Sequence, residues 1–128
     1  MKRILLDTHT LIWWMNGDQA LGEFALEFIA NENNQVYVSA ASVWEMSIKR
    51  QLGKLECPVD LDSVIESLGF SKLPISIFHS EQAGQLPIHH KDPFDRMLIA
   101  QAQAEGLQII TKDEHFPSYG ISLIDATK

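Results

Sequence analysis

Short apolar segments alternate with helical segments along the whole 128-residue sequence, and this alternation constrains the fold more than any other feature. Strands are predicted at residues 4–6, 36–38, 73–75, 107–111 and 121–124, where apolar, β-branched or aromatic side chains follow one another. Helical spacing and end signals predict helices over residues 8–15, 21–32, 39 or 42 to 52, 61–68, 78–85 and 94–105. The pattern indicates an α/β fold with a mainly parallel central sheet of about four or five strands, flanked by helices.

Length and composition are those of one globular domain, which we expect to span residues 1–128, with 45% hydrophobic and 21% charged residues. The single cysteine, Cys57, excludes an intrachain disulfide and favours a reduced, cytoplasmic setting. The apolar run before Asp7 is too short for an export signal, and no apolar stretch approaches the ~18 residues of a membrane span. The net charge of −7 leaves two interpretations open: a protein that never meets nucleic acid, or one that concentrates acids at a metal site.

Two acids directly follow predicted strands. Asp7 comes after residues 4–6, and Asp113 comes two residues after the strand at 107–111. Ligands of parallel sheets bind outside the carboxyl ends of the strands, so both acids are candidate site residues. The ordinary alternatives are a helix N-cap for Asp7 and a solvated loop acid for Asp113.

A third candidate is Asp95, at the beginning of the clearest predicted helix. Asp92 and Pro93 are typical of a helix start, so Asp95 could merely serve the cap or the helix dipole. However, Asp95 shares one helix face with the apolar residues at positions 98, 99 and 102. A carboxylate turned toward the core needs a partner, and a metal ion would supply one.

Glu45 is the fourth candidate, in the helix after the strand at 36–38. Its neighbours are mostly apolar, and Trp44 among them is expected in the core. The alternative role for Glu45 is an i,i+4 ion pair with Lys49. Four carboxylates near one rim would repel one another without cations, and oxygen ligands select Mg²⁺ or Mn²⁺. Such sites hydrolyse phosphodiesters with an activated water.

The sequence resembles the PIN domain family, and within it the VapC-type toxins of bacterial toxin–antitoxin pairs. The likeness extends from residue 1 to about residue 124 and is carried by four segments in order: ILLDT (4–8), VSAASVWE (38–45), DPFDRMLIA (92–100) and TKDEHF (111–116). Each motif alone is weak, whereas four in the right order and spacing are a strong signal. The resemblance implies a PIN-like single domain and a Mg²⁺- or Mn²⁺-dependent endoribonuclease.

The resemblance also implies roles for particular residues and partners. Carried across position by position, the family's acids are Asp7, Glu45, Asp95 and Asp113, which implies that they hold the metal and carry catalysis, and Thr8 and Thr111 match hydroxyl residues that order the site. It further implies an RNA substrate, a homodimer, and an antitoxin that inserts a side chain into the acidic cleft. Separately, five basic side chains are candidates for phosphate contacts, although ordinary surface charges explain each of them: Lys49, Arg50, Lys91, Arg96 and Lys112.

Two other functions stay open from the sequence. The chain could be a PIN-like module that binds partners without catalysis, which the presence of all four acids opposes. It could also be another Mg²⁺-dependent α/β phosphotransfer domain. A receiver domain would want paired acids after the first strand, and a phosphatase of the haloacid type would want a second Asp two residues beyond Asp7, where this sequence has His9.

Overall fold

The computed structural model describes residues 1–89, 91–113 and 116–128. In chain order the elements are β1 (Arg3–Leu6), α1 (Thr8–Asn16), α2 (Glu23–Ala30), β2 (Gln35–Ser39), α3 (Ala40–Gln51), α4 (Leu61–Ser67), β3 (Ser71–Leu73), α5 (Ile77–Gln85), α6 (Pro93–Glu105), β4 (Gln108–Thr111), the 3-10 helix η1 (Phe116–Tyr119) and β5 (Leu123–Asp125). The predicted alternation of strands and helices is therefore confirmed.

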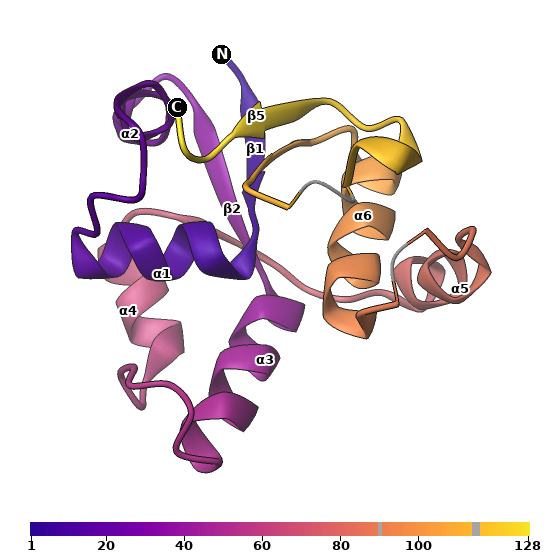
Figure 1. Ribbon diagram of the computed structural model, residues 1–128, viewed down its shortest axis with the longest axis horizontal. Helices are drawn as coiled ribbons and strands as arrows, with labels where there is room; N and C mark the ends of the chain where they lie inside the picture. Colours follow the sequence, from indigo (N-terminus) through magenta and orange to yellow (C-terminus); the bar gives the residue numbers. More distant parts are fainter. Residues whose placement is uncertain (90, 114–115) are drawn as a thin grey trace.

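The strands form one five-stranded sheet in the order β3-β2-β1-β4-β5. Each adjacent pair is parallel, so the expected mainly parallel sheet is confirmed. Figure 1 shows α1, α2 and α4 on one side of the sheet and α5 and α6 on the other. Within the described residues, none of the helices combines the length and the apolar character needed to cross a membrane.

The hydrophobic core lies on both faces of the sheet, as β1 illustrates. Ile4 and Leu6 pack into the cluster that includes Leu11 of α1, while Leu5 packs into the opposite cluster with Leu98 of α6. Successive strand residues point to opposite faces, so a strand buried on both faces must be apolar at every position. This burial explains why the first strand was readable from sequence.

The third strand is the clearest difference from the sequence prediction. It was expected at residues 73–75, but β3 ends at Leu73 and Pro74 lies outside it. Proline has no N–H to donate to a ladder, so the strand stops before it. β3 lies at an edge of the sheet, where a proline next to the strand is tolerated.

Candidate functional site

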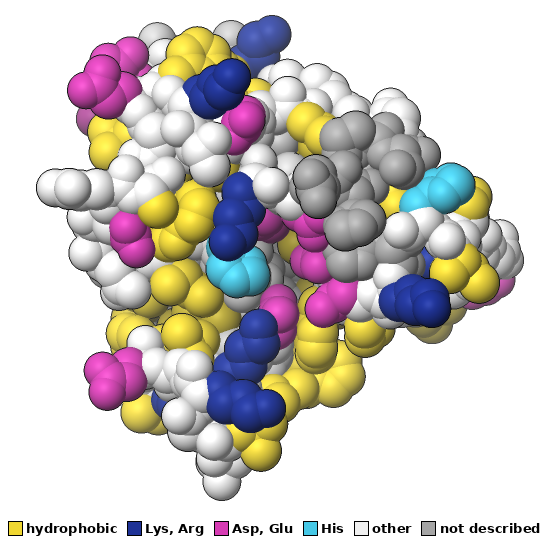
Figure 2. Space-filling view, in the orientation of Figure 1, with side chains coloured by type: hydrophobic (Ala, Val, Ile, Leu, Met, Phe, Trp, Pro, Cys, Tyr) yellow, Lys and Arg dark blue, Asp and Glu magenta, His cyan; other side chains and the backbone are white. Residues whose placement is uncertain are grey.

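The strand order reverses beside β1, whose neighbours are β2 on one side and β4 on the other. The carboxyl ends of β1 and β4 are adjacent, because the backbone N–H of Asp7 donates to the carbonyl of Ile110 at 3.2 Å. In parallel sheets this reversal opens a crevice in which ligands bind. Figure 2 shows acidic side chains around a hollow near the middle of the face viewed, with basic side chains along one side of it.

Asp7 directly follows β1, where the strand order reverses, and is also the N-cap of α1. Its side chain is buried, with the residue 4% exposed. One carboxylate oxygen accepts the Thr10 N–H at 2.8 Å, and the other accepts the hydroxyl of Thr111. The helix-cap and strand-end interpretations of the sequence are therefore both correct for this residue.

Burial dominates the electrostatics of Asp7. Loss of hydration raises the pKa of its carboxyl group, and the hydrogen bonds from Thr10 and Thr111 and the nearby charge of His9 only partly oppose this rise. Among the described residues, no lysine or arginine forms an ion pair with Asp7. Burial therefore destabilises the charged form of the Asp7 carboxylate, and a bound cation would offset this effect.

Thr111, the last residue of β4, connects two of the predicted acids. Its Oγ1 donates to Asp7 and accepts the backbone N–H of Asp113 at 2.9 Å. The half-buried Asp113 is thereby held at the carboxyl end of β4, next to the end of β1 that Asp7 follows. Thr111 thus orients Asp7 and the backbone of Asp113, and its role in ordering a metal site stays a prediction.

Glu45 on α3 is also buried, with the residue 6% exposed. Thr8 donates its hydroxyl to Glu45 Oε1 at 2.7 Å, and Lys49 Nζ lies 3.0 Å from Oε2. The Oγ atoms of Thr8 and Ser42 are 3.0 Å apart. Since the single Thr8 proton goes to the carboxylate, Ser42 donates to Thr8. The i,i+4 ion pair weighed as an alternative is therefore present beside the site contacts.

Ser42 was not among the predicted site residues, because a serine at this position suits the start of a helix. The cap of α3 is Ser39, whose side chain accepts the Ala41 N–H at 3.0 Å. The signal that could have found Ser42 is its spacing, since it stands three residues before Glu45 on the same helix face.

Asp95 lies in the first turn of α6 and is half-buried. As predicted, Asp92 caps this helix, accepting the Phe94 and Asp95 N–H groups at 2.9 and 3.1 Å. The apolar stripe below Asp95 is confirmed too, because residues 98, 99 and 102 are buried. The Phe94 ring packs edge-on against Trp44 at 5.3 Å, so the start of α6 lies against the part of α3 that carries Glu45.

The expectation that Trp44 belongs to the core is wrong, since the residue is 62% exposed. The buried face of α3 is formed by residues 41, 42, 45 and 46. Position 44 falls beside that face, so its indole covers Phe94 and otherwise faces solvent.

Among the basic candidates, Arg96 forms hydrogen bonds within the protein. Its guanidinium donates to the carbonyls of Ala83, Leu86 and Pro87 at 2.8, 2.9 and 3.2 Å, and so ties α6 to the carboxyl end of α5. These hydrogen bonds hold Arg96 within the protein, and its contact with a substrate stays a prediction.

Two other basic candidates also have defined contacts. Arg50 donates to the Pro58 carbonyl at 2.8 Å, which ties α3 to the loop before α4. Lys112 lies over the Trp13 ring at 5.2 Å, directly after the strand end that carries Thr111.

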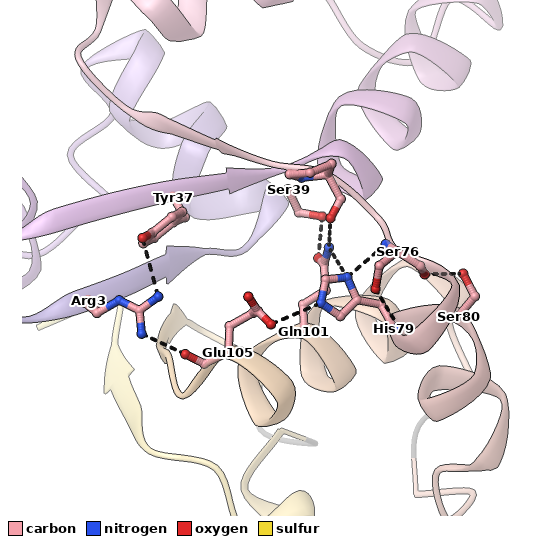
Figure 3. A network of polar contacts seen from close by, with 9 residues as sticks. Arg3, Tyr37, Ser39, Ser76, His79, Ser80, Gln101 and Glu105 are labelled. Atoms are coloured by element: carbon pink, nitrogen blue, oxygen red, sulfur yellow. Dashed lines mark hydrogen bonds and ion pairs between the residues drawn. The ribbon is translucent and has the colours of Figure 1, made fainter.

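A buried polar network fixes α6 against the starts of α3 and α5, as Figure 3 shows. Gln101, fully buried in α6, accepts the hydroxyl of Ser39 and donates to the Pro74 carbonyl at 3.2 Å. Next to it, Ser76 and His79 form a reciprocal capping box at the start of α5. Since α3 carries Glu45 and α6 carries Asp95, these contacts set how the two helices lie relative to each other.

The donor set of the site suits a hard divalent cation, because it offers carboxylate and hydroxyl oxygens. The buried charge of Asp7, without a basic ion-pair partner among the described residues, fits the same chemistry. Within residues 1–89, 91–113 and 116–128, however, no three Asp, Glu, His or Cys side chains converge as a ready metal-binding group. The structure thus presents acids of suitable chemistry on adjacent elements, held by Thr8 and Thr111.

Comparisons with known proteins identify the family of the chain and proteins that share its fold. The family model for the PIN domain matches residues 4–121. The chain is 25% identical over 122 residues to ribonuclease VapC22 of Mycobacterium tuberculosis, and the match covers 93% of each chain.

Two solved structures bear on the fold. DNA-bound VapBC from Salmonella typhimurium matches with a TM-score of 0.71 and 21% identity, covering 98% of both chains. VapC20 of Mycobacterium tuberculosis, described as a sarcin–ricin loop cleaving toxin, matches with a TM-score of 0.64 and 17% identity, covering 92% of this chain and 95% of the other. The arrangement of strands and helices is therefore one that these structures share.

Proposed function

The chain belongs to the PIN domain family, and from this membership we propose that it is a metal-dependent endoribonuclease, the toxin of a toxin–antitoxin pair. The proposed nuclease domain spans residues 1–128, and the proposed cofactor is Mg²⁺, with Mn²⁺ as an alternative. The likeness to ribonuclease VapC22 over most of both chains supports the activity.

One observation carries the proposal: the buried carboxylate of Asp7 lies where the strand order of the sheet reverses, and its pKa is raised by desolvation. A helix cap alone would not require burial, because exposed Asp60 caps α4 in the same way. A buried acid in a ligand crevice is typical of a functional site. A divalent cation would offset the cost of its charge.

We assign metal binding to Asp7, Glu45, Asp95 and Asp113. A bound Mg²⁺ or Mn²⁺ ion would supply the charge that activates water and neutralises the phosphate. Thr111 fixes the orientation of Asp7 through its hydroxyl, and Thr8 does the same for Glu45. These hydrogen bonds leave each carboxylate with lone pairs for a cation while holding its rotamer.

The proposed partners are RNA, a cognate antitoxin and a second copy of the chain. Support comes from the fold shared with the chain of DNA-bound VapBC from Salmonella typhimurium. Because its substrate would be cellular RNA, we propose that the protein acts in the cytoplasm.

The test is cleavage of RNA by purified protein free of antitoxin, with Mg²⁺, with Mn²⁺ and with EDTA. We expect metal-dependent cleavage that Asp7→Asn abolishes. Asp60→Asn is the matched control, because Asp60 is also an N-cap aspartate that accepts the N–H three residues on, but it is exposed. Absence of cleavage with either metal, or full activity of Asp7→Asn, would contradict the proposal and favour the non-catalytic alternative.

A further inference from the structure

Lys49 occupies one side of the buried Glu45 carboxylate. The Lys49 ammonium lies 3.0 Å from Glu45 Oε2, while Thr8 donates to Oε1. The Glu45 side chain is 8% exposed and the Lys49 side chain is 40% exposed. The carboxylate is therefore neutralised by a cation of the chain itself, and that cation reaches it from the solvent side.

The two buried acids of the site differ in this respect. Asp7 has neutral donors and, in the described part of the chain, no lysine or arginine partner, whereas Glu45 has an ammonium on one oxygen. A cation that binds Glu45 competes with Lys49 for the negative charge of this carboxylate. Because the Lys49 side chain is 40% exposed and solvent screens its charge, we expect a divalent ion to displace the ammonium.

A displaced Lys49 stays close to the site, since it is anchored one helical turn from Glu45. Its ammonium would then be an unpaired positive charge beside bound RNA, whose backbone carries one negative charge per phosphate. A flexible lysine side chain binds phosphate as a mobile point charge.

We propose that Lys49 is an exchangeable counter-ion, which neutralises Glu45 in the metal-free protein and transfers to an RNA phosphate when a divalent ion binds Glu45. The inference rests on the proposed function, because it assumes RNA as the substrate. It assigns Lys49 two roles, competition with the metal and contact with the substrate, and these have opposite effects when the residue is removed.

The first experiment measures Mn²⁺ binding to the intact protein without RNA, by electron paramagnetic resonance. Lys49→Met should bind Mn²⁺ about three- to tenfold more tightly than wild type, because the competing ammonium is gone. Lys54→Met removes the same charge from an exposed lysine just beyond α3, and should change the affinity less than about twofold because solvent screens it. Equal affinities of the two variants would overturn the proposal.

The second experiment measures RNA cleavage at saturating Mn²⁺. Lys49→Met should lower kcat/KM at least about tenfold, Lys49→Arg should recover part of it, and Lys54→Met should cleave like wild type. Unchanged kcat/KM in Lys49→Met would overturn the substrate role.

The two measurements distinguish failure of the counter-ion proposal from failure of the proposed ribonuclease function. If wild type binds Mn²⁺ but cuts no RNA, the proposed function fails and the transfer of Lys49 to RNA falls with it. In that case the affinities of Lys49→Met and Lys54→Met still decide whether Lys49 competes with the metal. If wild type binds no Mn²⁺, the counter-ion proposal is overturned.

Discussion

Replacing Thr111 with valine tests whether its hydroxyl stabilises and orders the buried Asp7 carboxylate. Valine has nearly the same shape as threonine, so Thr111→Val removes the hydroxyl without opening a cavity. The variant loses the donor to Asp7 Oδ2 and the acceptor of the Asp113 N–H. Thr111→Ser keeps both hydrogen bonds and serves as the conservative control.

The expected loss of stability follows from these two contacts of Thr111. A hydrogen bond to a charged group contributes about 1.5–3 kcal/mol. The contact to the half-buried Asp113 N–H, which water can partly replace, adds roughly 0.5–1 kcal/mol. At pH values where Asp7 is charged, the free energy of unfolding of Thr111→Val should therefore fall by about 2–4 kcal/mol, which lowers Tm by roughly 8–15 °C for a chain of this length.

The pH dependence of this loss identifies Asp7 as its source. The Thr111 hydroxyl lowers the pKa of Asp7 against the larger effect of burial, so the variant's Asp7 pKa should be higher still. The lost bond matters most when Asp7 is charged. The stability difference between Thr111→Val and wild type should therefore be full above the raised pKa of Asp7 and shrink as the pH falls through it.

Urea denaturation at a series of pH values measures the stability, and Mn²⁺ titration measures the site. Because Thr111 orders a proposed ligand, Thr111→Val should also weaken Mn²⁺ binding about ten- to hundredfold. A pH-independent loss of stability, or a Thr111→Ser variant as impaired as Thr111→Val, would refute the reasoning.

Three further variants test the remaining structural claims. Asp7→Asn keeps a good helix cap but removes the buried charge, so the metal-free variant should be more stable than wild type at pH 7. This advantage should vanish as the pH falls through the raised pKa of Asp7 toward the ordinary value of 3.8, and urea titrations showing a less stable variant at pH 7 would contradict it. Gln101→Leu leaves the Ser39 hydroxyl and the Pro74 carbonyl without their buried partner, and chemical denaturation should show a loss of about 2–4 kcal/mol. A loss below about 0.5 kcal/mol would show that the network in Figure 3 contributes little. Arg96→Met should lower Tm but leave the KM for RNA unchanged in folded protein, whereas a raised KM would return Arg96 to the substrate.

The positions of strands and helices could be predicted because their signals are local. Ile4, Leu5 and Leu6 form an apolar run because β1 is buried on both faces. Asp92 and Pro93 marked the start of α6, and the structure confirms both. The local signal failed at β3, where the position of Pro74 ends the strand earlier than its apolar neighbours suggested.

The candidate site was only partly predictable. Placement at strand ends identified Asp7 and Asp113, and helix spacing identified Asp95, because these features follow from the chain's own periodicity. The core position expected for Trp44 was wrong, since a hydrophobic side chain next to a buried face can still point to solvent. The anchoring of Arg96 on α5 carbonyls was also missed.

The sequence by itself determined which segments are strands and helices and which acids stand at their ends, because hydrophobic periodicity and capping act over a few neighbouring residues. Only the tertiary structure decided that β4 lies beside β1, and with it that Thr111 donates to Asp7 across 104 positions of the chain. The same holds for the contact of Thr8 with Glu45. Polar partners this far apart leave no periodic signal, because the packing of the whole sheet and its helices brings them together.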